Sequence, residues 1–278
     1  MRKLKEYLNR PLSFVMFLLI IISTVITALT VVFIIGYIFI KGVPNLSLDL
    51  FSLKYSSSNQ SMLPSIINTV YLTALTLLLS VPIGIFSAIY LAEYSRKNSF
   101  FVKIINIANE TLSGIPSIVY GLFGFFAFVI SKKWGYSLLA GVITLAIMVL
   151  PLIIRTSQEA MLGVDNTFRE ASYGLGAGKL RTVFKIVLPS AMPGILSGII
   201  LAIGRIVGET AALIYTAGTV PEAATKLTSS SRTISVHLYC LLNEGLYTKQ
   251  AYATAVVLIV FVVIINALSN ALAKKIMK

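Results

Sequence analysis

Six long runs of apolar residues constrain what this chain can fold into more than any other feature of its sequence. Each run provides about the 20 residues that an α-helix needs to cross roughly 30 Å of hydrocarbon. Backbone groups find no hydrogen-bond partner in lipid, so a spanning segment must satisfy its own groups as a helix. The sequence therefore predicts an all-α, polytopic membrane protein with six transmembrane helices in one domain, residues 1–278. We place the spans at residues 12–40, 64–92, 104–130, 136–154, 190–216 and 251–273.

The composition excludes several classes of protein. Charged residues make up 12% of the chain, whereas a soluble domain carries about a quarter. The net charge is +13, but the basic residues are scattered between apolar runs and form no clustered patch for nucleic acid. One cysteine and one histidine exclude a disulfide within the chain and a cysteine–histidine metal cluster. We therefore expect membrane lipids around the chain, and neither nucleic acid nor metal bound to it.

The basic residues indicate which way the spans cross the membrane. Fifteen of the 23 Lys and Arg residues lie in the N-terminus, the second-to-third connection, the fourth-to-fifth connection and the C-terminal tail. The alternate connections hold seven, and Arg205 lies inside a span. Short cytoplasmic connections are enriched in Lys and Arg. Both termini and the connection at residues 159–189 are therefore predicted to be cytoplasmic.

A glycine-rich run in that connection, residues 174–179, superficially suggests a phosphate-binding loop. A P-loop has four residues between its first glycine and a Gly-Lys pair, and a Ser or Thr follows the lysine. In this chain Tyr173 occupies the position of the first P-loop glycine. Leu180, which has no hydroxyl, follows Lys179. The chain is therefore not expected to bind a nucleotide, and no nucleophile–base pair suggests an enzyme.

The same connection predicts two short amphipathic helices outside the membrane. Thr167 and Glu170 have the spacing of a capping box, which predicts a helix start at Phe168. Its apolar side is predicted at Phe168, Ala171, Ser172 and Leu175, and a second helix at Leu180, Val183, Phe184 and Val187. Gly176 is expected to end the first helix and Pro189 the second. Such helices either dock into a groove of a soluble partner or lie on the bilayer surface, and the pattern alone does not choose.

The spacing of this segment resembles a motif of a known family. The segment resembles the EAA motif of ABC importer permeases. Its matching residues are Glu170-Ala171-Ser172, then Gly176 after three residues, Ile186 after nine more, and Leu188-Pro189 after one more. Ser172 replaces the usual second alanine. The resemblance implies a type I (MetI-like) architecture, in which this segment is a coupling helix that docks into a cytoplasmic ATPase. ATP is then used by that separate subunit, and this chain binds no cofactor.

A second segment resembles a smaller group within that family. Residues 204–211, Gly-Arg-Ile-Val-Gly-Glu-Thr-Ala, are similar to the signature of phosphate-specific ABC permeases of the PstA-like kind, with Ala212 where proline is usual. Residues 114–124 and 151–156 also look like this family. The resemblance implies a phosphate importer in the cell inner membrane. Its partners are a homologous PstC-like permease, two copies of a PstB-like ATPase and an extracytoplasmic PstS-like phosphate-binding protein.

Two charged residues lie deep inside the fifth predicted span. Arg205 follows Ser190 by 15 residues, or about 22 Å of helix, which places it near the middle of the bilayer. An arginine there must face the bundle and have a partner. Glu209 is four residues on, so one interpretation is a self-neutralising pair that joins helices. In the other, Arg205 binds an oxyanion, Glu209 holds the guanidinium and accepts a proton from phosphate, and Thr210 adjoins the pathway.

The remaining candidates carry two interpretations each. Arg155 ends the fourth predicted span, where it either anchors the helix at the headgroups or, by the resemblance, contacts the anion on its way out. Glu110 is expected to cap a helix or meet a basic group. Glycine and proline inside the spans favour either close helix packing or hinges along a translocation path. The hinge or pore-lining candidates are Gly114, Pro116, Ser117 and Gly208.

Two other functions remain open at this point. One is a permease of the same superfamily for another oxyanion, such as phosphonate, molybdate or sulfate. The other is a secondary transporter or channel with no ATPase, against which the coupling segment argues.

Overall fold

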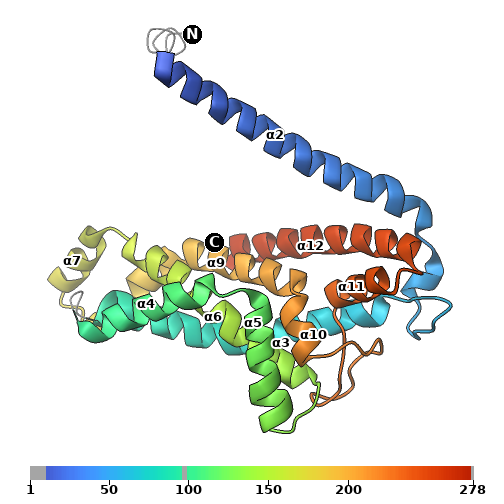
Figure 1. Cartoon of the computed structure of the whole chain (residues 1–278). Coiled ribbons are helices and arrows are strands. Elements are labelled where there is room, and N and C mark those ends of the chain that lie inside the picture. The colour runs from blue at the N-terminus through green and yellow to red at the C-terminus, as the bar shows by residue number, and fades with distance from the viewer. Residues whose placement is uncertain (1–10, 96–98, 277–278) are drawn as a thin grey trace.

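The computed structural model describes residues 11–95 and 99–276 and folds them into helices, with no β-strand among the described residues (Figure 1). Seven basic residues used for the orientation, Arg2, Lys3, Lys5, Arg10, Arg96, Lys97 and Lys278, lie outside the described residues. The long helices are α2 (Pro11–Gly42), α3 (Leu63–Ile89), α6 (Leu138–Leu162), α9 (Leu188–Gly208) and α12 (Thr248–Ile276). The shorter elements are η1 (Val43–Asn45), η2 (Leu48–Phe51), η3 (Tyr90–Tyr94), α4 (Phe100–Gly114), α5 (Ser117–Gly124), η4 (Phe125–Ser131), α7 (Asn166–Gly174), α8 (Lys179–Thr182), η5 (Val183–Val187), α10 (Ala211–Thr216) and α11 (Ile234–Glu244).

Five stretches of helix are long and apolar enough to cross a membrane, and the third predicted span is a bent pair that makes a sixth crossing if it counts as one. In that pair α4 and the segment Ser117–Ser131 meet at 101°. Proline disfavours the helical conformation of the residue before it, and Ile115 is extended at φ −71° and ψ 129°. The span predicted at residues 104–130 is therefore broken between Gly114 and Ser117, and Pro116 is the physical reason.

Two other predicted boundaries change. Helix α6 continues eight residues past the predicted end at residue 154, so residues 159–162 belong to it and not to the coupling loop. The fifth predicted span, residues 190–216, is also interrupted: α9 ends at Gly208, and α10 begins at Ala211. The second and sixth spans form α3 and α12 close to their predicted limits.

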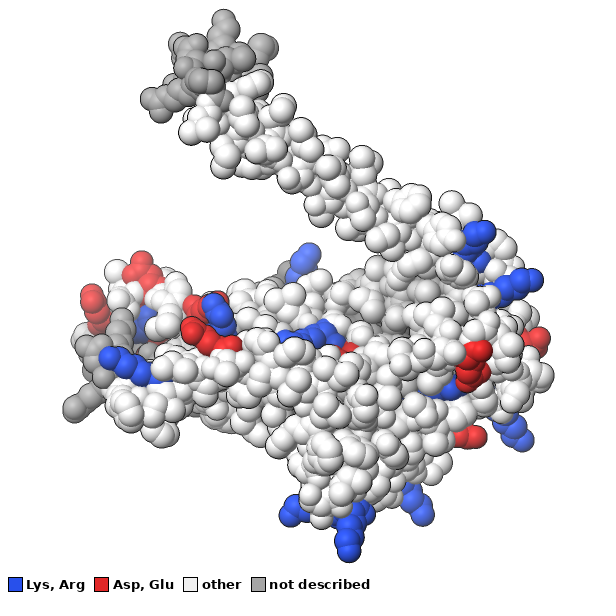
Figure 2. All heavy atoms as spheres, viewed as in Figure 1, with Lys and Arg blue, Asp and Glu red and all other residues white. Residues whose placement is uncertain are grey.

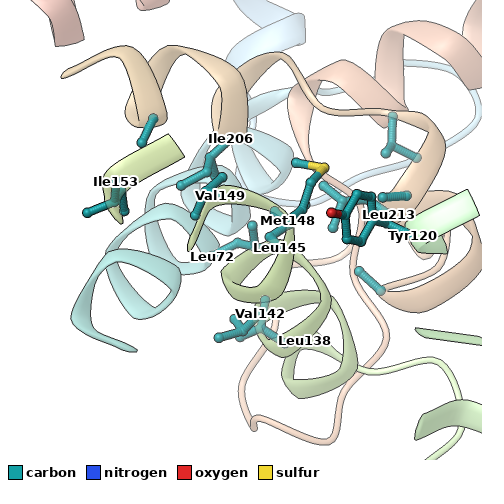
Figure 3. Packing of buried hydrophobic residues seen from close by; sticks show 14 residues of the cluster. Leu72, Tyr120, Leu138, Val142, Leu145, Met148, Val149, Ile153, Ile206 and Leu213 are labelled. Carbon is teal, nitrogen blue, oxygen red and sulfur yellow. The ribbon is translucent and has the colours of Figure 1, made fainter. Parts of the chain in front are cut away.

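Helices α3, α6 and α9 form the core, and glycines allow their close approach. A Cβ atom built at Gly84 would lie 2.6 Å from Cγ2 of Ile153, and one at Gly194 would lie 2.6 Å from Cβ of Ala160. One built at Gly198 would overlap Oγ1 of Thr156. Small residues let helix backbones approach in lipid, so the packing interpretation holds at these three glycines. Figure 3 shows the buried apolar cluster beside them, with Leu145, Met148 and Ile206 among its members.

Helix α2 stands apart from this core over most of its length (Figure 1). It meets α12 only near its own end, where a Cβ atom at Gly42 would lie 2.5 Å from Cγ2 of Val256. Figure 2 shows no charged residue along α2 until that end. The hydroxyls of Thr24, Thr27 and Thr30 each donate to the carbonyl four residues earlier at 2.8 Å. A helix that is apolar all round and satisfies its own hydroxyls is suited to lipid or to another membrane subunit.

Candidate functional site

The two interrupted helices pack against each other beyond their breaks. A Cβ atom at Gly121 of α5 would lie 2.8 Å from Cα of Ala212 in α10, so these helices are nearly in backbone contact. Tyr120 is buried, and its hydroxyl donates to the carbonyl of Leu112 at 2.8 Å. This bond ties α5 back to α4 across the bend. The fold thus brings together two discontinuous helices, the arrangement from which many transporters build substrate sites.

Glu209 lies at the break between α9 and α10 and does not pair with Arg205. Its backbone is extended, at φ −72° and ψ 131°, so it is not on the helix face of Arg205. Its side-chain Oε1 accepts a hydrogen bond from the Ala212 N–H at 3.0 Å, and the residue is 8% exposed. The i,i+4 pair of one interpretation is therefore wrong, and so is the role of Glu209 in holding the guanidinium in the other. The first turn of a helix has free N–H donors, and the carboxylate satisfies one of them where the chain restarts.

The positive charge of Arg205 is not neutralised by a carboxylate among the described residues. It lies in the last turn of α9 and is partly exposed. Within residues 11–95 and 99–276, the two ion pairs are Arg155–Glu159 and Arg169–Glu93, so Arg205 has no carboxylate within 4.0 Å there. Helix α9 ends at Gly208, three residues after Arg205. The guanidinium is thus placed near the meeting of the broken helices, and the self-neutralising interpretation loses its geometric basis.

A serine from the outer connection completes the end of α9. The last carbonyls of a helix have no partner within it, and Val207 O accepts a hydrogen bond from Ser235 Oγ at 2.5 Å. Ser235 lies in the first turn of α11, which Thr233 caps by accepting from Val236 N at 3.4 Å. Helix α11 covers Ile234–Glu244, and His237 on it is fully buried. The sequence analysis missed Ser235 and Tyr120, because their partners lie in other elements.

The predicted hinge residues all lie at the two breaks. Gly114 ends α4, Pro116 is the N-cap of α5, Ser117 begins that helix, and Gly208 ends α9. A Cβ atom at Gly114 or Gly208 would have no neighbour within 4 Å, so close packing does not explain either glycine. Thr210 follows in the second break and is partly exposed. Their placement favours the hinge interpretation for these positions.

Arg155 lies in a separate pocket of about 210 Å³ between α4 and α6. Its Nε donates to Glu159 Oε1 at 2.9 Å, and both side chains are exposed, at 60% and 63%. Glu110 lines the same pocket, but the ion pair of Arg155 is with Glu159. Two carboxylates, Glu110 and Glu159, therefore line the pocket that holds this one guanidinium. The other lining residues are Asn106, Asn109, Gln158 and Leu162.

The coupling segment begins differently from its prediction. Asp165 caps α7, because its Oδ1 accepts from Thr167 N at 2.9 Å and from Thr167 Oγ1 at 3.0 Å. These bonds lower the pKa of Asp165 below its ordinary value. Helix α7 therefore starts at Asn166, two residues before Phe168. The predicted capping box of Thr167 and Glu170 is wrong, because aspartate is a strong N-cap and already occupies the position.

Gly176 ends α7 as predicted, and the geometry shows why a glycine is there. Its φ is +80°, a conformation that only glycine adopts readily. Gly176 N donates to Tyr173 O at 2.9 Å, and Ala177 N donates to Ser172 O at 3.1 Å. These two bonds form a Schellman motif. Ser172, which replaces the usual alanine, is buried with its Oγ 2.8 Å from Thr182 Oγ1, so its hydroxyl has a partner.

Pro189 does not end the second helix, which is a correction. The chain runs from α8 through the π-helical turn η5 directly into α9, and Pro189 lies in the first turn of α9. Proline is tolerated there because the first N–H groups of a helix need no partner within it. Glu170 and Ala171 are exposed, while Ile186 and Leu188 are partly buried against the chain.

Several large apolar side chains of the coupling segment are exposed. Val183 and Val187 of the predicted stripe are buried, whereas Leu180 and Phe184 are exposed. Leu175 at the turn is 89% exposed. In Figure 1, α7 projects beyond the ends of the long helices at one end of the molecule. We call this surface the coupling patch, and its members are Phe168, Tyr173, Leu175, Leu180 and Phe184.

Residues 80–278 match the family described as "Binding-protein-dependent transport system inner membrane component". The chain belongs to this family. The permease is 34% identical over 275 residues to the phosphate transport system permease protein PstA of Pasteurella multocida, covering 95% of this chain and 93% of that one. It is 32% identical over 249 residues to the probable ABC transporter permease protein YqgI of Bacillus subtilis, covering 83% and 84%.

Solved structures with the same fold belong to importers of other substrates. A bacterial ABC transporter involved in the import of alginate matches the permease with a TM-score of 0.68 and 18% identity, over 100% of both chains. The MetNI methionine ABC transporter matches with a TM-score of 0.58 and 16% identity, over 77% of this chain and 94% of that one. At such identities the likeness shows the fold alone. The family and the PstA relative, together with this fold, make the chain a multi-pass membrane subunit of an ABC importer, and such permease subunits are not themselves enzymes.

Proposed function

We propose that this permease forms one half of the translocation pathway of an ATP-driven phosphate importer. The observation that carries the proposal is Arg205, a guanidinium without a carboxylate partner among the described residues, near the meeting of two broken helices. The PstA relatives support phosphate as the substrate class. The Bacillus subtilis relative is named only as a probable ABC permease, so the substrate depends on the chemistry of the site.

Arg205 suits a tetrahedral oxyanion. Its planar fork of N–H donors matches two oxygens at once, and charge-assisted bonds of this kind are about twice as strong as neutral ones. Partial burial in the bundle weakens the competition from water. The Ala212 N–H occupies Oε1 of Glu209, and we assign the other oxygen the role of accepting a proton from phosphate. Sulfate has no proton to give, so a carboxylate at this point disfavours it.

The proposed partner subunits are assigned from the coupling segment and from the pathway. The coupling patch is the docking surface for a PstB-like ATPase, present in two copies, one for each permease. A PstC-like permease supplies the other half of the pathway, and a PstS-like protein delivers phosphate from outside the cell membrane. Thr210 and the hinge residues line the route near Arg205, and the anion leaves past Arg155, where two carboxylates promote release.

Replacing Arg205 with Gln tests this proposal in the complete transporter reconstituted in proteoliposomes. We expect phosphate uptake to be lost, because removing one bidentate charged contact costs about 1.5–3 kcal/mol or more in a site shielded from water. Assembly and basal ATP hydrolysis should persist. Lys54→Gln, a charge loss in the outer loop, is the matched control and should transport normally. Wild-type uptake by Arg205→Gln, or failure of that variant to assemble, would contradict the proposal.

Competition separates phosphate from other oxyanions in the same assay. Excess unlabelled phosphate should block uptake of labelled phosphate, whereas phosphonate, molybdate and sulfate should not. Competition by one of these anions at a lower concentration than phosphate requires would reassign the substrate. Uptake driven by an ion gradient without ATP would instead point to a secondary transporter.

A further inference from the structure

We propose that the ion pair between Arg169 and Glu93 is the mechanical link that carries movement of the coupling segment into helix α3. The proposal rests on the role of this segment as the ATPase docking element in the proposed function. Arg169 lies on α7, and Glu93 lies in η3, the π-helical turn that extends α3. The two residues are 76 positions apart in the chain.

The guanidinium of Arg169 is held on all sides. Its Nη2 lies 2.7 Å from Glu93 Oε1, and its Nε lies 3.1 Å from the same oxygen. Nη2 also donates to Met161 O at 2.8 Å, and Nη1 donates to Val164 O at 2.7 Å. Met161 is in the last turn of α6, and Val164 follows that helix. One side chain of α7 therefore grips the ends of both α3 and α6.

Burial distinguishes this pair from an ordinary surface contact. The side chains of Arg169 and Glu93 are 13% and 6% exposed, whereas those of Arg155 and Glu159 are 60% and 63% exposed. An exposed pair contributes little, because water competes for both charges. Removing one partner of a buried pair leaves an uncompensated charge, which is strongly unfavourable. The buried pair therefore resists separation when α7 is displaced.

Neighbouring contacts point to the same linkage. Lys179 at the start of α8 places its Nζ 4.9 Å from the ring centre of Tyr94, the residue after Glu93. Beside the pair, an apolar cluster joins the same elements, with members from α3, α6, η5 and α9. Its buried residues are Ala88, Ile89, Met161, Val183, Val187, Ala191 and Ile195. A movement of the coupling segment is thus transmitted to α3 and α6 as a packed unit.

The link leads from the cytoplasmic end toward the site of Arg205. Helix α3 packs along α6, where Gly84 lies against Ile153. Ile153 belongs to the buried cluster that also contains Ile206, the neighbour of Arg205 on α9. Packed cores shift between discrete arrangements and do not deform continuously. We therefore assign Arg169 and Glu93 to positioning: they touch neither phosphate nor ATP, and they couple the two.

The test uses the complete transporter with Glu93→Gln, Arg169→Gln and the double variant. Phosphate uptake, ATP hydrolysis and thermal stability are measured on the same assembled preparations. We expect each single variant to transport at least about tenfold fewer phosphate ions per ATP, the scale of losing one partner of a buried charged pair. Because the partners act together, the double variant should be no worse than the poorer single variant. Lys103→Gln, a charge loss on the exposed side of α4, should keep the wild-type ratio.

The ratio of phosphate to ATP separates coupling from folding. A purely structural role would lower the yield and thermal stability of the complex but leave that ratio unchanged in the complexes that assemble, which would overturn the proposal. Multiplicative losses in the double variant would also overturn it. If the wild-type complex transports another oxyanion, phosphate is the wrong substrate, but the same ratio measured with that anion still tests the link.

Discussion

At the scale of single residues, charges in this permease are placed by the nearest unsatisfied backbone groups. Glu209 is four residues from Arg205 but bonds to Ala212 N, because the start of α10 offers a free donor at 3.0 Å. Arg169 bonds to two free carbonyls at the end of α6 as well as to Glu93. Sequence spacing suggested the first pair and gave no sign of the second. Helix ends decided both, since each end leaves several backbone groups without partners.

His237 provides a prediction about pH. Burial and the charge of Arg232 lower the pKa of this histidine from 6.5 to about 3. The folded state therefore holds it neutral while the unfolded chain binds a proton, so its stability contribution is full above pH 6.5 and falls as the pH drops toward 3. At pH 5 the loss is about 2 kcal/mol. We expect the apparent Tm in detergent to fall less for His237→Phe than for wild type between pH 7.5 and 5. Equal falls in both proteins would contradict this prediction.

At the scale of elements, two predicted spans are broken into separate helices, and three short helical elements have π geometry. Apolar periodicity detects a run that can cross a membrane but not the point at which the helix stops. The local causes are visible in the sequence, such as Pro116 after Ile115, but their consequence depends on neighbours. A broken helix persists in a membrane only where other groups satisfy its ends. Ser235 and Glu209 do so here.

The glycines of α9 give a prediction about helix packing. A Cβ atom at Gly198 would overlap Thr156 Oγ1, which is itself held by the Leu152 carbonyl at 2.9 Å. Gly198→Ala should therefore push α9 away from α6 and destabilise the permease by about 1–3 kcal/mol. Gly36→Ala is the control in α2, where nothing lies within 4 Å, and it should be neutral or slightly stabilising. Thermal unfolding of the two variants measures the difference, and equal stability would show that the α6–α9 contact is looser than described.

At the scale of the whole molecule, most helices pack into one core, and helix α2 lies outside it. Helices α3, α6 and α9 pack on one another, while α2 exposes apolar side chains along nearly its whole length. That both termini and the coupling segment share one side of the membrane stays a prediction from the basic residues. The exposed α2 is suited to the lipid or to the second permease that the proposed function requires.

Sidedness can be measured directly. In a Cys240→Ser background, we expect Lys132→Cys to react with a membrane-impermeant thiol reagent in intact cells whose outer barrier is open. Arg181→Cys should react only after the membrane is permeabilised. Both positions are exposed in the structure, so accessibility reports the side of the membrane and not burial. The opposite pattern would invert the orientation deduced from the basic residues.

The sequence by itself determined the membrane class, the number of apolar runs, the coupling segment and its glycine turn. These features depend on the length of apolar runs and on local backbone conformation, which are set by neighbouring residues and not by tertiary contacts. The tertiary structure alone decided that Glu209 caps α10, that Arg205 is left without a carboxylate among the described residues, and that Arg169 reaches Glu93. Pairing among charged groups depends on which free helix ends and burial sites lie within about 3 Å of them. That information arises only when distant segments pack together.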